Sequence, residues 1–273
     1  MRGASRETYR LASDKLAEVS RAASPETLDR VGDELIAVAG LLAHEPRLRR
    51  ALADPARASA DRAGLLDGLV AGHVGDETRE VLRELGGGRW SGTVDLLDAV
   101  ELLGVNALLS SADRAGDLGE VEDELFRFGQ VVDASPELAA ALGDPTVPAT
   151  QRATLVDSLL DGKAKPATVK LAKQALAGFG GRTFTAGLTR LVELAAELRD
   201  QQVAYVTVAT PLTEEEEQSL GAKLAQMYGR EVALKVTVDP SVLGGARVLI
   251  GSDLYEGTVL RRLTDVRNAL AAK

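Results

Sequence analysis

The residues that could perform chemistry in this chain are few and stand apart from one another. The histidines are His44 and His73, and neither has a cysteine or a second histidine at the spacing of a metal site. Gly162-Lys163 would suit a phosphate loop, but such a loop needs glycine where this chain has Asp157. We therefore expect no catalytic residue, no metal site and no bound cofactor.

Two further patterns match functional sites only in residue type. The run Gly178-Phe179-Gly180-Gly181 lacks the third glycine of a dinucleotide-binding turn, and it follows an expected helix instead of a strand. The acidic residues Glu214 to Glu217 and Asp123-Glu124 are typical of solvated helix faces, where carboxylates also favour the positive end of a helix. An enzyme is therefore a remote interpretation.

Composition and charge exclude further classes of protein. The formal net charge is −9 and no long run of Lys or Arg interrupts it, which opposes binding to nucleic acid. No run of about 18 apolar residues could span a membrane, so we expect no direct membrane insertion. The chain has 0 cysteines, which fits a reducing cytoplasm.

An internal repeat organises the first two hundred residues. Residues 28–69 match residues 118–159 without a gap, at an interval of ninety, and Asp54-Pro55 recurs as Asp144-Pro145. Aromatic residues make up only 3% of the chain, so the cores must consist of Leu, Val and Ala, which favours helices. We expect two tandem helical bundles, 1–103 and 104–200.

The last seventy residues follow a different period. Apolar residues alternate from Val203 to Val208, as in a buried strand, and again from Val232 to Val238 and from Ala246 to Ile250. Thr213 and Glu216 have the spacing of a capping box, which begins a helix that we expect to end near Gly229. We predict a β-α-β-β-α domain over 201–273, and hence a mainly helical chain with a small α+β module.

The most specific pattern in the chain lies between Val238 and Leu263. Its residues are Asp239, Pro240, Gly244, Gly245, Gly251, Glu256, Gly257 and Thr258. The glycine pair connects two expected strands, whereas a phosphate loop leads from a strand into a helix, so we interpret the pair as a tight turn.

This pattern closely resembles the C-terminal signature of the delta subunit of F-type ATP synthases, called the oligomycin-sensitivity-conferring protein in mitochondria. The family has Asp at the position of Glu256 and Ser at that of Thr258, so both differences keep the charge or the hydroxyl. The length and the repeat resemble the long delta subunits of actinomycetes. In the family the helical bundle is normally present once, and the additional copy departs from that pattern.

The resemblance implies a non-catalytic stator subunit in the peripheral stalk, at the cytoplasmic face of the cell membrane. It implies contacts with the N-terminal segments of the α subunits and with the C-terminal helices of the b subunits. The α contact is expected through the first and fifth helices of a bundle, near Tyr9, Leu11, Leu16, Val81 and Leu85 or near Leu108, Leu109, Leu171 and Leu176. The b contact is expected near Val259, Leu260, Leu263, Val266 and Leu270.

Two alternatives remain open at the level of sequence. One is a small-molecule-sensing adaptor whose C-terminal module binds a ligand beside Gly244-Gly245, with Ser241, Arg247 and Ser252 as polar groups. The other concerns the final helix, whose apolar stripe could cover the small sheet instead of contacting a partner. The sequence does not indicate which bundle would bind the α subunits.

Overall fold

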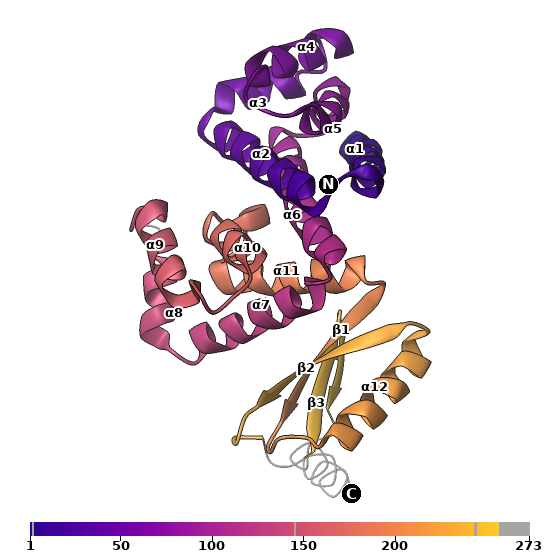
Figure 1. Ribbon diagram of the computed structural model, residues 1–273, viewed down its shortest axis with the longest axis vertical. Coiled ribbons are helices and arrows are strands. Elements are labelled where there is room, and N and C mark those ends of the chain that lie inside the picture. Colours follow the sequence, from indigo (N-terminus) through magenta and orange to yellow (C-terminus); the bar gives the residue numbers. More distant parts are fainter. Residues whose placement is uncertain (2, 145, 243–244, 257–273) are drawn as a thin grey trace, which may run out of the picture. The chain divides into compact units, whose positions relative to one another are not determined.

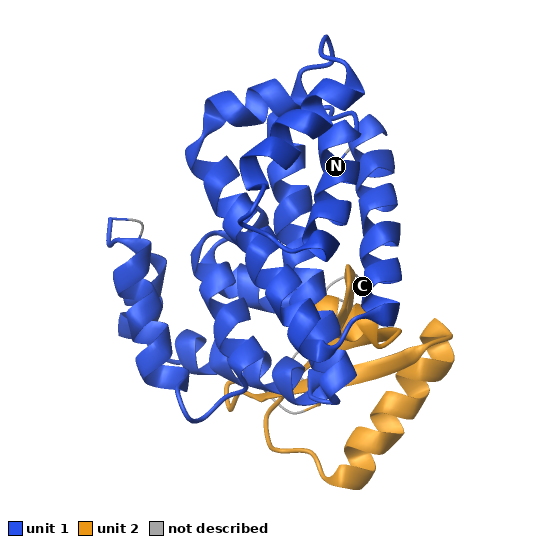
Figure 2. Cartoon of the chain, turned by 45° about the horizontal axis from the view of Figure 1, so that its top comes forward, with its two compact units in different colours: residues 1–191 blue, residues 192–273 orange. Residues whose placement is uncertain are grey.

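The computed structural model describes residue 1 and residues 3–144, 146–242 and 245–256. The chain divides into two compact units, Met1–Leu191 and Val192–Lys273 (Figure 2). The first unit is helical, and the second contains a small mixed sheet (Figure 1). This confirms the predicted fold class. The predicted final helix lies outside the described residues.

The first unit is a series of helices joined by short loops. In chain order they are α1 (Gly3–Ala22), α2 (Pro25–His44), α3 (Pro46–Ala53), α4 (Ser59–Val70), α5 (Asp76–Gly87) and α6 (Thr93–Ala115). Then follow α7 (Leu118–Asp133), α8 (Pro136–Gly143), α9 (Ala149–Leu160), α10 (Pro166–Leu176), the 3-10 turn η1 (Phe179–Gly181) and α11 (Phe184–Leu198). Helix α11 extends across the division between the two units.

Helix boundaries follow the interval of ninety residues closely from the third helix to the fifth of each copy, although the residues that cap the helices are only partly shared. Prolines follow Ser24, the N-cap of α2, and Ser135, the N-cap of α8. These two serines are not equivalent in the repeat, because Ser135 corresponds to Glu45, which precedes α3 without a side-chain cap. Asp54 and Asp144 each accept a hydrogen bond from the backbone N–H two residues later, which ends the preceding helix in a turn.

A carboxylate also recurs at the start of the fifth helix of each copy. Glu34 accepts hydrogen bonds from the N–H of Gly75 at 3.0 Å and from the hydroxyl of Thr78. Glu124, ninety residues later, accepts from the N–H of Lys165 at 2.9 Å and from the hydroxyl of Thr168. These bonds satisfy backbone donors that a helix leaves unpaired at its N-terminus. They therefore fix where α5 and α10 begin.

Helix α6 has a part in both copies. When the sequence is shifted by ninety residues, α1 aligns with α6, because Gly3 corresponds to Thr93. The same helix packs on α1, α2 and α3 of the first copy and on α7 and α10 of the second. It is therefore the last helix of the first bundle and the first helix of the second. The expected limit between 103 and 104 falls inside this continuous helix, and the division into three domains stays a prediction.

The second unit contains a sheet with the strand order β2-β1-β3-β4. Its elements are β1 (Gln201–Val208), α12 (Glu214–Tyr228), β2 (Glu231–Val238), β3 (Ala246–Ile250) and β4 (Asp253–Glu256). Strand β1 pairs with β2 in parallel and with β3 antiparallel. The capping box of Thr213 and Glu216 is present, and Gly229 ends α12 at φ 71°.

One face of this sheet forms a core with α12. Ala204, Val206 and Val208 of β1 are buried there with Leu224 of α12. The register places Leu234 and Val236 of β2 beside them on the same face. The alternation seen in the sequence therefore corresponds to one covered face of the sheet.

Strand β4 was not predicted from the sequence, which indicated only a turn between Ile250 and Glu256. In the structure Gly251 has φ 56°, and the chain reverses so that Asp253–Glu256 pairs antiparallel with β3. A strand of 4 residues is too short to show an alternating pattern. Its pairing depends on the neighbouring strand, which the sequence pattern does not reveal.

Candidate partner-binding surfaces

A groove of about 280 Å³ lies between α1 and α5 in the first unit. It is lined by the apolar residues Val19, Ala22 and Ala23 and by the carboxylate-bearing residues Glu18, Glu77 and Glu80. The small side chains leave space between the two helices, and the acidic side chains stand at the surface. This combination suits the apolar face of a partner helix that also carries positive charge.

The charges around this groove are only partly paired. Lys15 donates to Glu18 at 2.7 Å, and this hydrogen bond holds the pKa of Glu18 below its usual value. Arg30 of α2 donates to Glu77 at 2.9 Å. Glu80 forms no ion pair within 4.0 Å among the residues that the structure describes, although Lys15 attracts it at longer range. The groove therefore keeps a negative potential that attracts cations.

Most residues predicted to contact the α subunits lie in the core of the first unit. Seven of them expose 6% or less of their surface: Leu16, Val81, Leu85, Leu108, Leu109, Leu171 and Leu176. Tyr9 is half-buried and its hydroxyl accepts from Asn106, whereas Leu11 is 44% exposed. In this conformation a partner reaches Leu11 but none of the seven buried side chains, which instead hold the helices in place. The contact itself stays a prediction.

Sequence reasoning missed the acidic residues that line the groove. Glu77, Glu80 and Glu84 recur at three- and four-residue spacing, and such residues lie on one side of a helix. That spacing could have indicated an acidic stripe on α5. It could not indicate that α1 lies beside the stripe, because this depends on how the bundle packs.

The described part of the C-terminal signature forms tight turns. Asp239 accepts from the N–H of Ser241 at 2.9 Å, and hydrogen bonds from Ser241 hold the pKa of Asp239 below its usual value. Gly245 has φ 78°, which favours glycine. Arg247 forms an ion pair with Glu256 at 3.5 Å. This geometry matches the interpretation of the pattern as turns between strands.

Several predicted site residues lie outside the described part of the chain. They are Gly244, Gly257 and Thr258 of the signature and the expected b contacts Val259, Leu260, Leu263, Val266 and Leu270. Their roles stay predictions.

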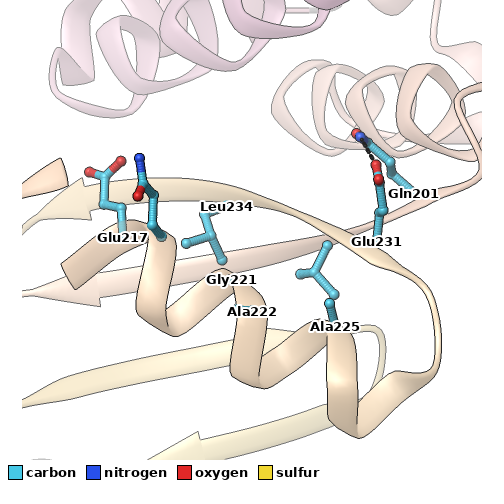
Figure 3. Close-up of a pocket in the computed structure, with 9 residues that line it drawn as sticks. Gln201, Glu217, Gly221, Ala222, Ala225, Glu231 and Leu234 are labelled. Carbon is cyan, nitrogen blue, oxygen red and sulfur yellow. Dashed lines mark hydrogen bonds between the residues drawn. The ribbon is translucent and has the colours of Figure 1, made fainter. Parts of the chain in front are cut away.

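A second groove, of about 490 Å³, lies in the second unit between α12 and β2 (Figure 3). Glu217 lies toward one end of it, and Gln201 donates to Glu231 at 2.9 Å toward the other. Between them, Gly221, Ala222 and Ala225 of α12 face Val232 and Leu234 of β2. Within the described residues β2 pairs only with β1, so its outer edge is available for contact.

The described ranges contain neither a metal-binding cluster nor a membrane-spanning helix. No group of three or more His, Cys, Asp or Glu side chains in them could hold a metal ion. None of the helices described is long and apolar enough to cross a bilayer.

Comparison with known proteins identifies the family. The protein-family model for the ATP synthase delta (OSCP) subunit matches residues 105–270. The chain is 61% identical over 269 residues to ATP synthase subunit delta of Salinispora arenicola, and the alignment covers 98% of each chain. It is 43% identical to ATP synthase subunit delta of Streptomyces avermitilis, with 99% of this chain and 98% of that protein covered. The chain belongs to the ATP synthase delta (OSCP) subunit family.

The match to the family begins inside α6, so α1 to α5 lie outside the matched residues. The relatives from Salinispora and Streptomyces nevertheless align with nearly the whole chain and therefore with the first copy too. A chain in the structure of the Toxoplasma gondii mitochondrial ATP synthase hexamer is 19% identical, with a TM-score of 0.36, covering 62% of this chain and 96% of that one. A TM-score this low carries no argument about the fold.

Proposed function

We propose that this chain is a non-catalytic stator subunit in the peripheral stalk of a proton-translocating F-type ATP synthase. It joins the α3β3 catalytic head to the membrane-anchored b subunits and prevents the head from turning with the rotor during ATP synthesis. It is a peripheral component of the complex, at the cytoplasmic face of the membrane. The observation that carries this proposal is the alignment of nearly the whole chain with ATP synthase delta subunits.

The architecture supports a linking role. Each of the two compact units has a core of its own and an open groove at its surface. A linking subunit needs two separate binding surfaces. An interface that stays bound under torque must be a stable one, and stable interfaces bury more than about 1,000 Å² in total. Grooves of this kind receive amphipathic helices or extended segments.

For the α subunits, the proposed surface is the groove between α1 and α5. Glu80 of α5 lines this groove and is exposed, and Leu11 of α1, which is 44% exposed, lies outside its lining residues. The remaining residues expected at this contact act from the core, by holding the two helices at their present spacing. An N-terminal segment of an α subunit would bind here as an amphipathic helix.

For the b subunits, the proposed surface is the second unit. The expected contacts between 259 and 270 belong to it, and the groove between α12 and β2 is the surface available among its described residues. The small residues of α12 allow a partner to approach closely. A C-terminal segment of a b subunit would bind there.

The alternative of a small-molecule-sensing adaptor has no support from the comparisons, whose matches are ATP synthase delta subunits. Near the signature turn, Ser241 donates to Asp239 and Arg247 pairs with Glu256. These polar groups are thus engaged within the turn and its strands.

Co-purification tests the proposal. The chain is tagged in its native host, extracted from membranes and analysed by peptide mass spectrometry. We expect the α, β and b subunits to be recovered with it when the membranes are solubilised in mild detergent. Recovery of the chain without them under gentle, low-salt extraction would overturn the proposal.

A further inference from the structure

The groove between α1 and α5 has a counterpart in the second copy, because the copies are related by ninety residues. Leu108 of α6 corresponds to Glu18, and Ala112 corresponds to Ala22. On the fifth helix, Lys170 of α10 corresponds to Glu80. The two copies therefore offer the same backbone positions with different charges.

In the second copy these positions are already covered by a helix of the first copy. Helix α2 packs along α6 (Figure 1), and a Cβ at Gly32 would lie only 2.6 Å from Cδ2 of Leu108. The same helix reaches α10, because Lys170 pairs with Asp29 at 2.8 Å and with Asp33 at 2.6 Å. Helix α2 thus stands where a partner helix would stand in the first copy.

The spacing of the two acidic residues on α2 explains why both bind the same lysine. Asp29 and Asp33 are four residues apart, so both lie on one side of the helix and both reach Lys170. Gly32 lies between them and allows the helix axis to approach α6 closely. The second copy therefore shows how a helix with one small residue and two charged residues covers the first and fifth helices of a bundle.

We infer that the open groove of the first copy binds an amphipathic helix in the way that α2 covers α6 and α10, with the charges reversed. Glu80 stands in place of Lys170, so the partner helix carries Lys or Arg four residues apart where α2 carries Asp29 and Asp33. Glu18 and Glu77 add to the same negative surface, although Lys15 and Arg30 partly neutralise them. This inference rests on the proposed function, because the partner helix would belong to another ATP synthase subunit.

The duplication then has a specific consequence. Within the described residues, the two helical copies offer one groove for a partner helix between their first and fifth helices, not two, because that of the second copy is covered by α2. The first copy supplies both the covering helix and the remaining open groove. Helix α6 and the Lys170 ion pairs hold the two copies together while leaving that groove accessible.

A charge-swap experiment on the full-length chain tests the inference. The probes are two labelled peptides with the sequence of residues 25–44 of this chain, one unchanged and one with Asp29→Lys and Asp33→Lys. Binding is measured by fluorescence anisotropy at low ionic strength, where exposed ion pairs are strongest. We expect the lysine peptide to bind about fivefold more tightly than the unchanged peptide.

The reciprocal variant is Glu80→Lys in the full-length chain, and we expect it to reverse the order of the two peptides. The matched control is Glu137→Lys, the same charge change at an exposed position on α8, which should keep the original order. Equal binding of the two peptides, binding of neither, or an unchanged order in Glu80→Lys would overturn the inference.

The same variants separate this inference from the proposed function. When the tagged wild-type chain recovers the α, β and b subunits and Glu80→Lys recovers α and β less well, both stand. Equal recovery by both chains overturns the inference and retains the proposed function. Failure of the wild-type chain to recover any of them is a failure of the proposed function itself.

Discussion

At the scale of single residues, the repeat is most evident in buried polar contacts. Glu34 and Glu124 bind equivalent donors at the start of α5 and α10, although these helices differ in most surface residues. Arg62 and Arg152 likewise donate to carbonyl oxygens of the turn after the third helix, those of Arg57 and Val147. Such contacts connect helices that are distant in sequence, so their loss should lower the stability of the whole bundle.

Glu34→Ala should destabilise the first copy. It removes the acceptor for the N–H of Gly75 and for the hydroxyl of Thr78, which is 0% exposed. Leaving buried donors unsatisfied costs about 1–3 kcal/mol in the free energy of unfolding. Urea unfolding followed by the fluorescence of Trp90 measures it, with Glu137→Ala as an exposed control. A loss no larger than that of the control would contradict the assigned role.

Glu101 should make stability depend on pH. Burial raises the pKa of Glu101 and Asp98 raises it further, while the hydrogen bond from the N–H of Gly180 at 3.0 Å opposes them. A carboxyl whose pKa is higher in the folded chain contributes stability below its unfolded pKa and loses it as the pH rises through its folded pKa.

Glu101→Gln should therefore remove this loss. The amide oxygen still accepts from Gly180 but carries no charge, so the variant gains stability relative to wild type as pH rises and then levels off. Urea unfolding from pH 4 to pH 8 measures the difference. A difference that stays constant over this range would show that Glu101 does not ionise at a cost in the folded chain.

At the scale of elements, the close approach of α2 and α6 depends on glycine. An added Cβ at Gly32 would meet Leu108 at 2.6 Å and the carbonyl oxygen of Gly104 at 3.1 Å. Gly32→Ala should cost about 1–3 kcal/mol, because the helices must move apart. In Gly40→Ala the new atom meets nothing within 4 Å, and the variant should gain about 0.5–1 kcal/mol from helix propensity.

Thermal unfolding of these two variants tests the packing argument within one helix. Both variants add the same methyl group to α2, but only the one at Gly32 meets α6. We therefore expect Tm to fall in Gly32→Ala and to rise in Gly40→Ala. Equal shifts in Tm would mean that α2 and α6 do not pack as closely as the structure describes.

The groove of the second unit allows a similar comparison on α12. Ala225→Phe places a ring in the groove beside Leu234, whereas Gln226→Phe adds the same ring at an exposed position. If the groove binds a b segment, the first variant should bind b about tenfold more weakly and the second should bind normally. Binding measured with purified b subunit distinguishes them, and equal affinities would exclude the groove.

The sequence predicted the elements better than their relations. The capping box of Thr213 and the glycine at position 229 are local signals, and each stands at the helix end expected. The shared role of α6 was missed because α1 and α6 have few identical residues. Leu85 and Leu108 were expected at the α contact because the family resemblance implies the first and fifth helices, and the sequence alone does not show that both side chains are buried.

At the scale of the whole molecule, the chain has two units with separate cores and an open groove on each. In the proposed function, torque passes from one partner to the other through this chain. A duplicated bundle in which α6 is shared lengthens the first unit without adding a flexible linker between the copies. In the proposed function the second copy would act as a spacer, since α2 already covers its first and fifth helices.

Cross-linking mass spectrometry of the intact complex tests the linking role most directly. Lys15 is the only lysine before Lys163, so its cross-links report on the α1–α5 groove, while those of Lys223 report on α12. The account predicts that Lys15 is linked to an α subunit and Lys223 to a b subunit. Links from both lysines to the same subunit, or links confined to this chain, would contradict it.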